Sequence, residues 1–249
     1  MGNYILRRVE PDRSRPRLWF HDYLHLRPIA LDLERRIRAA VGEHAPRRVL
    51  DLGCGASPYR RFFGDVETYV RVDLAPHVAP DVIARGEGLP FADAAFDMVL
   101  STQALQLSKD PAAVAAEIAR VARPGARVWV TAPLAWPYDA ATEHRLGVPQ
   151  LGALFGGLRV VEVVPQGGML AFPCALWNVM VREAVLAAER RLGPPAKLLR
   201  IPAAAFYLAS NLAGRALERA AAAGPAAGLL PFLDARLPAN VLVSAERPR

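Results

Sequence analysis

The chain has 249 residues, of which 53% are apolar, and its net charge is +7 at neutral pH. This length is enough for one sizeable α/β domain. The apolar runs are shorter than the 18 or more residues of a membrane-spanning helix, so a spanning protein is not expected. The two cysteines give neither a disulfide framework nor the ligand spacing of a zinc site, so no metal is expected.

The positive charge is almost all arginine and is concentrated towards the N-terminus. Acidic residues are interspersed there, and the arginines do not alternate with aromatic residues, which is typical of a solvated helix face. We therefore expect no nucleic-acid partner, while contact with an anionic membrane surface stays open. The start of the sequence lacks the apolar stretch of a signal peptide, which predicts a cytoplasmic protein.

Residues 1–45 are expected to form an arm and cap helices. Charges and prolines interrupt any period in residues 1–16, whereas apolar residues recur at spacings of four or five over residues 18–41. This spacing predicts a helix. Pro28 is expected to kink it or to start a second helix at its first turn.

Short valine-rich apolar runs follow, separated by helix-sized or turn-rich stretches. Such runs suit strands that are buried on both faces of a sheet. Their alternation with helices, as at residues 111–122, indicates right-handed crossovers between parallel strands. Pro124 and Gly125 are expected to end that helix before the next strand. Strands are expected at residues 48–51, 68–73, 81–84, 96–101, 127–131, 159–164 and 240–245, and a further short helix at residues 147–155.

Residues 166–236 lie before the final strand and form mainly helical patterns, with apolar segments at 171–188 and 198–222. Their prolines and glycines argue against an independent domain. We expect a helical insertion that packs on the sheet and acts as a substrate lid or faces a membrane. The expected core is residues 46–165, and residues 237–249 hold the final strand and a tail.

The strongest functional signal is the turn after the first strand, Val49-Leu50-Asp51-Leu52-Gly53-Cys54-Gly55. Two glycines flank one small residue, so the backbone can bend tightly and a ligand can approach without meeting a Cβ atom. Pro58 stands where a dinucleotide fingerprint has its third glycine, and no Gly-Lys-Ser/Thr of a P-loop follows. A ligand without a pyrophosphate therefore fits this turn better.

Asp73 ends the next predicted strand. In a doubly wound sheet this spacing delivers a carboxylate to the two hydroxyls of a ribose. Taken alone, Asp73 could equally cap a helix or close a strand-end turn. Its combination with the glycine turn favours the ribose role.

Three further motifs follow in order: Gly86-Glu87-Gly88-Leu89-Pro90-Phe91, Phe96-Asp97-Met98-Val99-Leu100 and Arg120-Val121-Ala122-Arg123-Pro124-Gly125. The whole set, over residues 47–135, resembles the class I S-adenosylmethionine-dependent methyltransferases of the small-molecule group that includes quinone-biosynthesis enzymes. The resemblance implies a Rossmann-like fold: a mostly parallel, seven-stranded sheet with helices on both faces. It also implies S-adenosylmethionine as the cofactor.

Carried over by position, the resemblance gives each cofactor-binding residue a role. Asp51, Gly53, Cys54 and Gly55 would face the methionine part; Asp73 would bind the ribose and Leu74 the adenine; Gly86 and Glu87 would border the adenine edge; Ser101 and Thr102 would form the floor beneath the methyl group. The sequence departs from the family pattern at two places. Arg85 stands where an acidic residue usually meets the adenine amino group, and Leu107 stands where a histidine is common.

Methyl transfer from a sulfonium needs alignment and exclusion of water, and needs a base only where the acceptor must lose a proton. His144, in the loop after the fifth predicted strand, is the candidate base; alternatively it is a surface histidine paired with Glu143 or Asp139. Tyr23, His25 and Tyr138 are candidate substrate contacts. For Tyr23 and His25, packing of an aromatic stripe on the sheet is the alternative.

We therefore expect a methyltransferase of secondary metabolism that acts on an oxygen of a small, apolar metabolite, such as a natural product, a glycoside or a lipid-linked intermediate. One alternative is a scaffold protein of the same fold that binds S-adenosylmethionine without turnover, motivated by Arg85 and Leu107. The other is a methyltransferase at the periphery of a membrane. A nucleic-acid methyltransferase is disfavoured, because Ser101-Thr102-Gln103-Ala104 replaces the base-pocket motif after the fourth strand. The sequence does not bear on oligomeric state.

Overall fold

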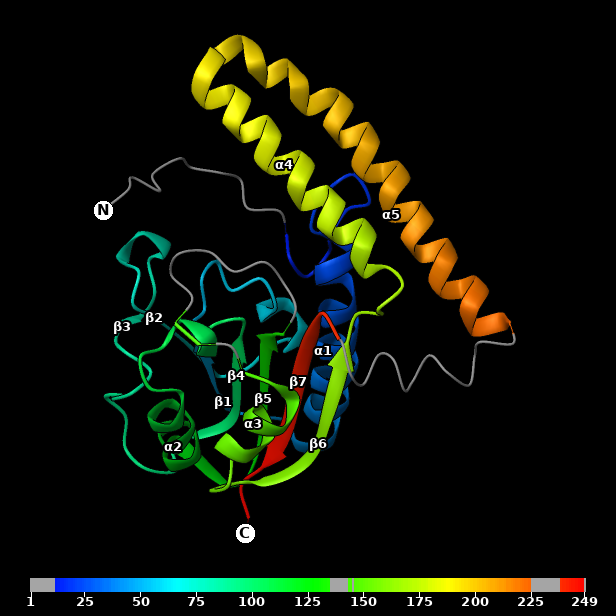
Figure 1. The fold of residues 1–249 in the computed structure, drawn as a ribbon. Coiled ribbons are helices and arrows are strands. Elements are labelled where there is room, and N and C mark those ends of the chain that lie inside the picture. The colour runs from blue at the N-terminus through cyan, green and yellow to red at the C-terminus, as the bar shows by residue number, and fades with distance from the viewer. Residues whose placement is uncertain (1–11, 135–142, 145, 225–237, 249) are drawn as a thin grey trace.

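The computed structural model describes residues 12–134, 143–144, 146–224 and 238–248. Within them, seven strands form one sheet in the order β3-β2-β1-β4-β5-β7-β6 (Figure 1). The five strands β1 to β5 pair in parallel, and β7 runs antiparallel to both of its neighbours. The predicted mostly parallel, seven-stranded sheet is confirmed. The strands are β1 (Arg48–Leu52), β2 (Thr68–Asp73), β3 (Val82–Ile83), β4 (Phe96–Thr102), β5 (Ala122–Pro133), β6 (Arg159–Gln166) and β7 (Asn240–Glu246).

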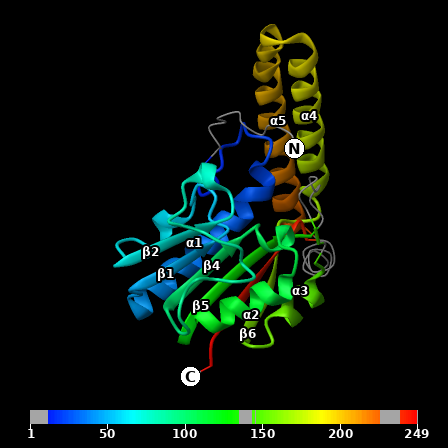
Figure 2. The same cartoon turned by 90° about the vertical axis from the view of Figure 1, so that its left-hand side faces the viewer.

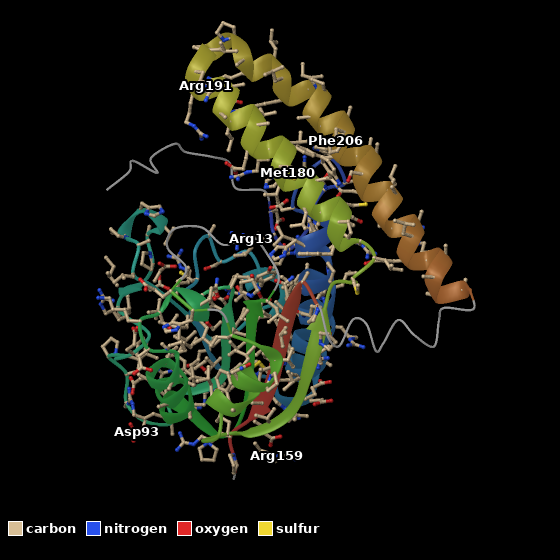
Figure 3. All side chains as sticks on the ribbon, in the orientation of Figure 1. Arg13, Asp93, Arg159, Met180, Arg191 and Phe206 are labelled. Carbon is tan, nitrogen blue, oxygen red and sulfur yellow. The ribbon has the colours of Figure 1, made fainter. Side chains whose placement is uncertain are left out.

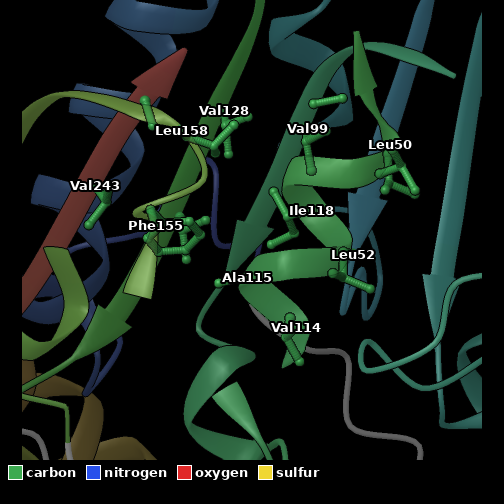
Figure 4. Close-up of a cluster of buried hydrophobic side chains, with 14 of the residues drawn as sticks. Leu50, Leu52, Val99, Val114, Ala115, Ile118, Val128, Phe155, Leu158 and Val243 are labelled. Atoms are coloured by element: carbon green, nitrogen blue, oxygen red, sulfur yellow. The ribbon is translucent and has the colours of Figure 1, made fainter. Parts of the chain in front are cut away.

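Helices cover both faces of the sheet, because its central strands carry apolar side chains on both sides. On one face, Leu50 and Val99 lie beside Ile118 of α2 (Pro111–Val121), and Phe155, at the end of α3 (Val148–Leu154), belongs to the same buried cluster (Figure 4). On the other face lies α1 (Tyr23–His44), whose residues Ile29, Leu33 and Ile37 are fully buried. Their spacing of four residues keeps them on one side of the helix.

Two local predictions differ from the structure. Of the two alternatives for Pro28, the start of a second helix is wrong, because α1 is continuous from Tyr23 and includes Pro28 in its second turn. Strand β5 begins at Ala122, directly after α2, so Pro124 and Gly125 lie within the strand rather than before it. Gly125 has a φ of +81°, and the β4–β5 register shifts there, which accommodates the irregular stretch.

The largest difference concerns the insertion. Its two long helices, α4 (Phe172–Leu192) and α5 (Arg200–Ala223), are joined by the 3-10 turn η4 (Pro194–Leu199). They form a hairpin that projects beyond the edge of the sheet where the parallel strands end (Figures 1 and 2). The predicted packing of this insertion on the sheet is wrong. Three shorter 3-10 turns, η1 (Arg60–Phe62), η2 (Pro76–Val78) and η3 (Leu105–Leu107), lie in the connections between strands.

The foot of the hairpin packs against the start of α1. Tyr23 and Leu24 form a small buried cluster with Ala171 and Ala175. The amide of Asn211 donates hydrogen bonds to the backbone carbonyls of Leu18 and Phe20 and accepts one from Asn178, at 2.7–2.9 Å. These buried polar contacts fix the hairpin to the domain at one end only. Among the described residues, no helix has the length and apolar character needed to cross a bilayer.

Candidate functional site

A cavity of about 750 Å³ opens at the carboxyl ends of β1, β2 and β4. Its volume is in the range of small-molecule sites. Strand β1 lies between β2 and β4. The chain adds β2 and β3 on one side of β1 and then continues with β4 on the other side, so the strand order reverses at β1. In open α/β sheets, ligands bind at such a reversal of strand order. The cavity therefore lies where the sheet topology predicts a ligand site.

The turn after β1 forms one wall of the cavity and needs both of its glycines. Gly53 has a φ of +68° and Gly55 a φ of +50°. The backbone N–H groups of Gly53 and Cys54 both donate to the carbonyl of Val72, at 2.8 and 3.1 Å. A Cβ atom on Gly53 would lie 2.3 Å from the Cβ atom of Ala104, whereas a Cβ atom on Gly55 would meet open space. Close packing therefore requires the first glycine, and the second leaves the cavity open.

Asp73, at the end of β2, faces this turn across the cavity wall. One carboxylate oxygen accepts the N–H of Gly55 at 2.9 Å, and the other accepts the N–H of Ala75 at the same distance. Each oxygen of an ionised carboxylate has a second lone-pair site, so both can accept further hydrogen bonds from a ligand. The structure thus brings together the glycine turn and the carboxylate that the sequence singled out.

Asp51 lies behind the turn and is not among the described residues that line the cavity. Its buried carboxylate accepts a hydrogen bond from the hydroxyl of Tyr69 at 2.8 Å. Burial raises the pKa of Asp51 to about 6, although the bond from Tyr69 opposes this shift. Asp51 therefore bonds to β2 from within the sheet, and its predicted contact with the methionine part of a cofactor stays a prediction.

Cys54 lines the cavity between the two glycines and is buried. Burial, together with the charges of Asp51 and Asp73, raises the pKa of its thiol to about 11. The thiol is protonated at neutral pH, so it is a poor nucleophile. Its place in the cavity wall is that of a small apolar side chain.

The remaining predicted cofactor residues all line the cavity. The carboxylate of Glu87 already has a protein partner, because one of its oxygens accepts a hydrogen bond from the backbone N–H of Lys109 at 2.9 Å. Arg85 also lines the cavity at the place where the resemblance expects an acidic residue. These predicted residues are Leu74 after β2, Gly86 and Glu87 in the loop after β3, and Ser101 and Thr102 at the end of β4.

Asp12 and Arg13 are among the lining residues that were not predicted. They belong to the arm before α1, which lies over the carboxyl edge of the sheet, where Figure 3 labels Arg13. The hydroxyl and the N–H of Ser14 bind the carboxylate of Asp12 at 2.6 and 2.9 Å and shape the arm locally. The only sequence signal was the cluster of N-terminal arginines, which does not distinguish Arg13 from its neighbours.

Two of the candidate substrate contacts, Tyr23 and His25, are not brought to the cavity. Tyr23 is buried at the foot of the hairpin. His25 is buried beside β7, with its Nδ1 3.2 Å from the amide nitrogen of Asn240. Burial lowers the pKa of His25 to about 3, so its ring is neutral. Neither side chain is among the described residues that line the cavity, because both are buried at the start of α1. Tyr138 lies outside the described residues.

His144 is also absent from the described lining of the cavity. Its Nε2 lies 3.0 Å from the backbone carbonyl of Lys109, and its backbone N–H donates to the carbonyl of Gln106. A carbonyl only accepts hydrogen bonds, so this contact assigns the proton to Nε2 and leaves Nδ1 as the acceptor. Of its predicted alternative partners, Asp139 lies outside the described residues.

Most of the residues that line the cavity lie in a part of the chain that is similar to known proteins. Residues 50–130 match the family model described as a methyltransferase domain. A relative from Pseudescherichia vulneris, malonyl-[acyl-carrier protein] O-methyltransferase, is 34% identical over 108 residues, which cover 37% of this chain and 41% of the relative. The match thus spans about two fifths of the relative's length.

Solved structures with the same fold cover most of the chain. A provisionally assigned sarcosine dimethylglycine methyltransferase from Galdieria sulphuraria has a TM-score of 0.55 at 13% identity and covers 90% of this chain and 88% of its own. The [4+2]-cyclase SpnF has a TM-score of 0.53 at 16% identity, covering 86% and 80%. An S-adenosylmethionine-dependent methyltransferase from Mesorhizobium loti has a TM-score of 0.50 at 16% identity, covering 91% and 98%. At these identities the likeness shows the fold alone, and the cyclase illustrates that one fold hosts different reactions.

Proposed function

Because the chain carries a class I S-adenosylmethionine-dependent methyltransferase domain, we propose that it methylates an oxygen atom of a small molecule that binds beside the cofactor. The observation that carries this proposal is the pairing of Gly55 with Asp73 at the mouth of β1 and β2. It supplies an open backbone turn and a carboxylate with free acceptor sites on one wall of the cavity.

The residues present fit the cofactor. The space beside Gly55 admits a ligand that a side chain would exclude. We propose that Asp73 binds the ribose hydroxyls, that Leu74 packs on the adenine, and that the turn faces the methionine part. Asp51 is proposed to hold the turn through Tyr69, and the other lining residues to keep the roles that the family resemblance gives them.

When bound, S-adenosylmethionine supplies a methyl group that its sulfonium already activates. The protein therefore has to hold the acceptor oxygen in line and exclude water. We propose that Ser101 and Thr102 form the floor of the reaction site and that the arm at Asp12 and Arg13 covers it from above. This part of the proposal is supported by their common place in the cavity lining.

The acceptor oxygen is proposed to be one that is already ionised, such as a carboxylate on a small molecule with an apolar body. Two observations support this choice. The described lining of the cavity contains no histidine, and an ionised oxygen needs no general base. Arg13 brings a guanidinium to the same cavity, where it would attract an anion. The relative from Pseudescherichia vulneris is itself an O-methyltransferase by name.

A second candidate is a protein of this fold that binds S-adenosylmethionine but does not transfer its methyl group. Arg85 and Leu107, which line the cavity and depart from the family pattern, favour this candidate. The two are separated by incubating the chain with S-adenosylmethionine labelled in its methyl group and a panel of small organic acids. Labelled esters together with S-adenosylhomocysteine support the proposal. Cofactor binding in calorimetry without any labelled product across the panel would favour the second candidate.

A further inference from the structure

The far end of the α4–α5 hairpin exposes large apolar side chains. Leu192, Leu198 and Ile201 are 69–71% exposed, although leucine and isoleucine usually lie in the core of a folded protein. Leu198 lies in η4, and Leu192 and Ile201 lie on either side of it, at the end of the hairpin opposite its foot (Figure 1). We call residues 190–201 the hairpin tip. An exposed apolar group of this kind marks a surface that contacts another body.

Basic side chains surround these apolar residues. Arg190, Arg191 and Lys197 are exposed, and none of them forms an ion pair with another of the described residues. Figure 3 shows Arg191 near the far end of the hairpin. The one acidic residue beside the tip, Glu189, is already neutralised by Arg200, at 2.6 and 2.8 Å. The tip therefore combines exposed apolar side chains with a net positive charge.

The apolar surface continues from the tip along the outer side of α5. Leu208 and Leu212 are exposed there, and no charged residue occurs between Arg200 and Arg215. The buried residues of α5 are Ala203, Tyr207, Asn211 and Gly214, and Asn211 bonds to Asn178 of α4. The buried side of α5 thus holds no leucine or isoleucine, and Leu208 and Leu212 are directed outward.

We propose that the hairpin tip docks on the surface of an anionic lipid bilayer. Leucine and isoleucine side chains at the tip would enter the boundary between head groups and acyl chains, and the basic side chains would meet the phosphate groups. The hairpin rises from the carboxyl edge of the sheet, so the tip and the cavity lie on the same side of the domain (Figures 1 and 2). Docking would place the cavity towards the membrane, where acceptors with lipid-like bodies are concentrated.

Charge favours a bilayer over a second copy of the chain as the occupant. Residues 172–223 hold seven basic and three acidic side chains, so two hairpins that pack on each other would bring like charges together. An anionic surface complements the same charges. Each basic side chain near such a surface is worth about 1 kcal/mol, which is about fivefold in the partition coefficient.

The test is flotation of the full-length chain with lipid vesicles. The wild-type chain is expected to float with vesicles of phosphatidylcholine and phosphatidylglycerol and not with vesicles of phosphatidylcholine alone. Leu198→Glu is expected to reduce the bound fraction by about tenfold, because it removes one inserted apolar side chain. Its matched control is Leu217→Glu, which makes the same change at a residue that is half-exposed and lies near the foot of the hairpin.

A second pair of variants tests the charge. Lys197→Glu is expected to weaken binding by at least fivefold and to reduce its salt dependence, whereas Arg219→Glu, near the foot, leaves both close to wild type. Thermal unfolding shows whether each variant is folded. Absence of flotation, or equal losses for tip and foot variants, would overturn the proposal. So would a dimer in sedimentation that Leu198→Glu dissociates, since the tip would then bind a second copy. Docking does not require methyl transfer. Vesicle binding therefore tests the docking proposal, and formation of labelled esters tests the proposed function, independently of each other.

Discussion

The carboxylate of Asp73 accepts a hydrogen bond from the backbone N–H of Gly55 at 2.9 Å, so the end of β2 is tied directly to the turn after β1. The second oxygen of the same carboxylate holds the N–H of Ala75. The carboxylate is therefore oriented before any ligand arrives, which reduces the cost of ordering it on binding. A change at either residue will affect both the shape of the turn and the charge beside it.

Gly55→Ala should weaken the binding of S-adenosylmethionine by at least tenfold and lower stability only modestly. The new methyl group meets no protein atom and enters the space left for the ligand. The left-handed backbone at φ +50° costs a residue with a Cβ atom about 1–2 kcal/mol. Isothermal titration calorimetry and thermal unfolding measure the two effects.

Gly64→Ala is the matched control for this change. Gly64 has a φ of +63°, is exposed, and also offers open space to a Cβ atom, but it does not line the cavity. It should share the loss of stability and keep the wild-type affinity. Equal affinities for the two variants would show that the space beside Gly55 is not used by the cofactor.

Gly53→Ala should lower stability much more than Gly55→Ala, because its Cβ atom would lie 2.3 Å from that of Ala104. Overpacking of this kind typically costs about 1–3 kcal/mol in addition to the backbone strain. The double variant with Ala104→Gly removes the overlap and should recover a part of the loss. Urea unfolding of the two single variants and the double variant gives the coupling energy directly. Strict additivity would show that the two residues do not press on each other.

His25 should make the protein less stable in acid. Its folded-state pKa of about 3 lies below the ordinary value of 6.5, because burial, with Arg13 and His21 nearby, disfavours the charged ring. The unfolded chain therefore binds more protons below pH 6.5, and the free energy of unfolding falls by up to about 1.4 kcal/mol for each pH unit below it.

Urea unfolding at pH 7 and pH 5 checks this effect. The wild-type chain should lose about 2 kcal/mol more than His25→Gln between these two pH values. His77→Gln removes an exposed histidine and should behave as the wild type. If His25→Gln retained the wild-type acid sensitivity, the buried ring would not be the cause.

His144→Ala tests whether this histidine acts as a base. The structure assigns it a hydrogen bond to the carbonyl of Lys109, whose loss costs about 1 kcal/mol of stability. With an ionised acceptor oxygen, kcat should stay within a few-fold of wild type and the pH profile should keep its shape. A fall of about 100-fold or more, with loss of the limb that follows histidine ionisation, would instead make it the general base.

The sequence predicted the parts of the site that depend on local geometry. A tight turn after a buried strand requires glycine, and a carboxylate at the next strand end reaches the same edge of a parallel sheet. For this reason the turn at Gly53 and Gly55 and the position of Asp73 could be predicted without coordinates. Asp51 belongs to the same motif, but its carboxylate accepts a hydrogen bond from Tyr69 of the neighbouring strand. The sequence of one strand does not show which side chain of the next strand will lie beside it.

Features that depend on tertiary packing could not be predicted. Apolar periodicity indicates that residues of the insertion are helical, but it does not state which neighbour each helix packs on. Here the contact at Asn178 and Asn211 joins the two helices, and their foot packs on α1 instead of the sheet. The contact between Tyr23 and the foot of the hairpin could not be predicted either, and Tyr23 was therefore expected at the substrate. Arg13 reaches the cavity through the path of an irregular arm, which no period encodes.

The central claim is that Asp73 and the glycine turn bind S-adenosylmethionine, and calorimetric titration of the cofactor tests it most directly. The wild-type chain and Asp65→Ala, an exposed control on the preceding turn, should bind with the same affinity. Asp73→Ala should lose at least about 100-fold, since it removes a charged acceptor worth about 1.5–3 kcal/mol for each hydrogen bond. Wild-type affinity in Asp73→Ala, or no binding by the wild-type chain, would contradict the claim.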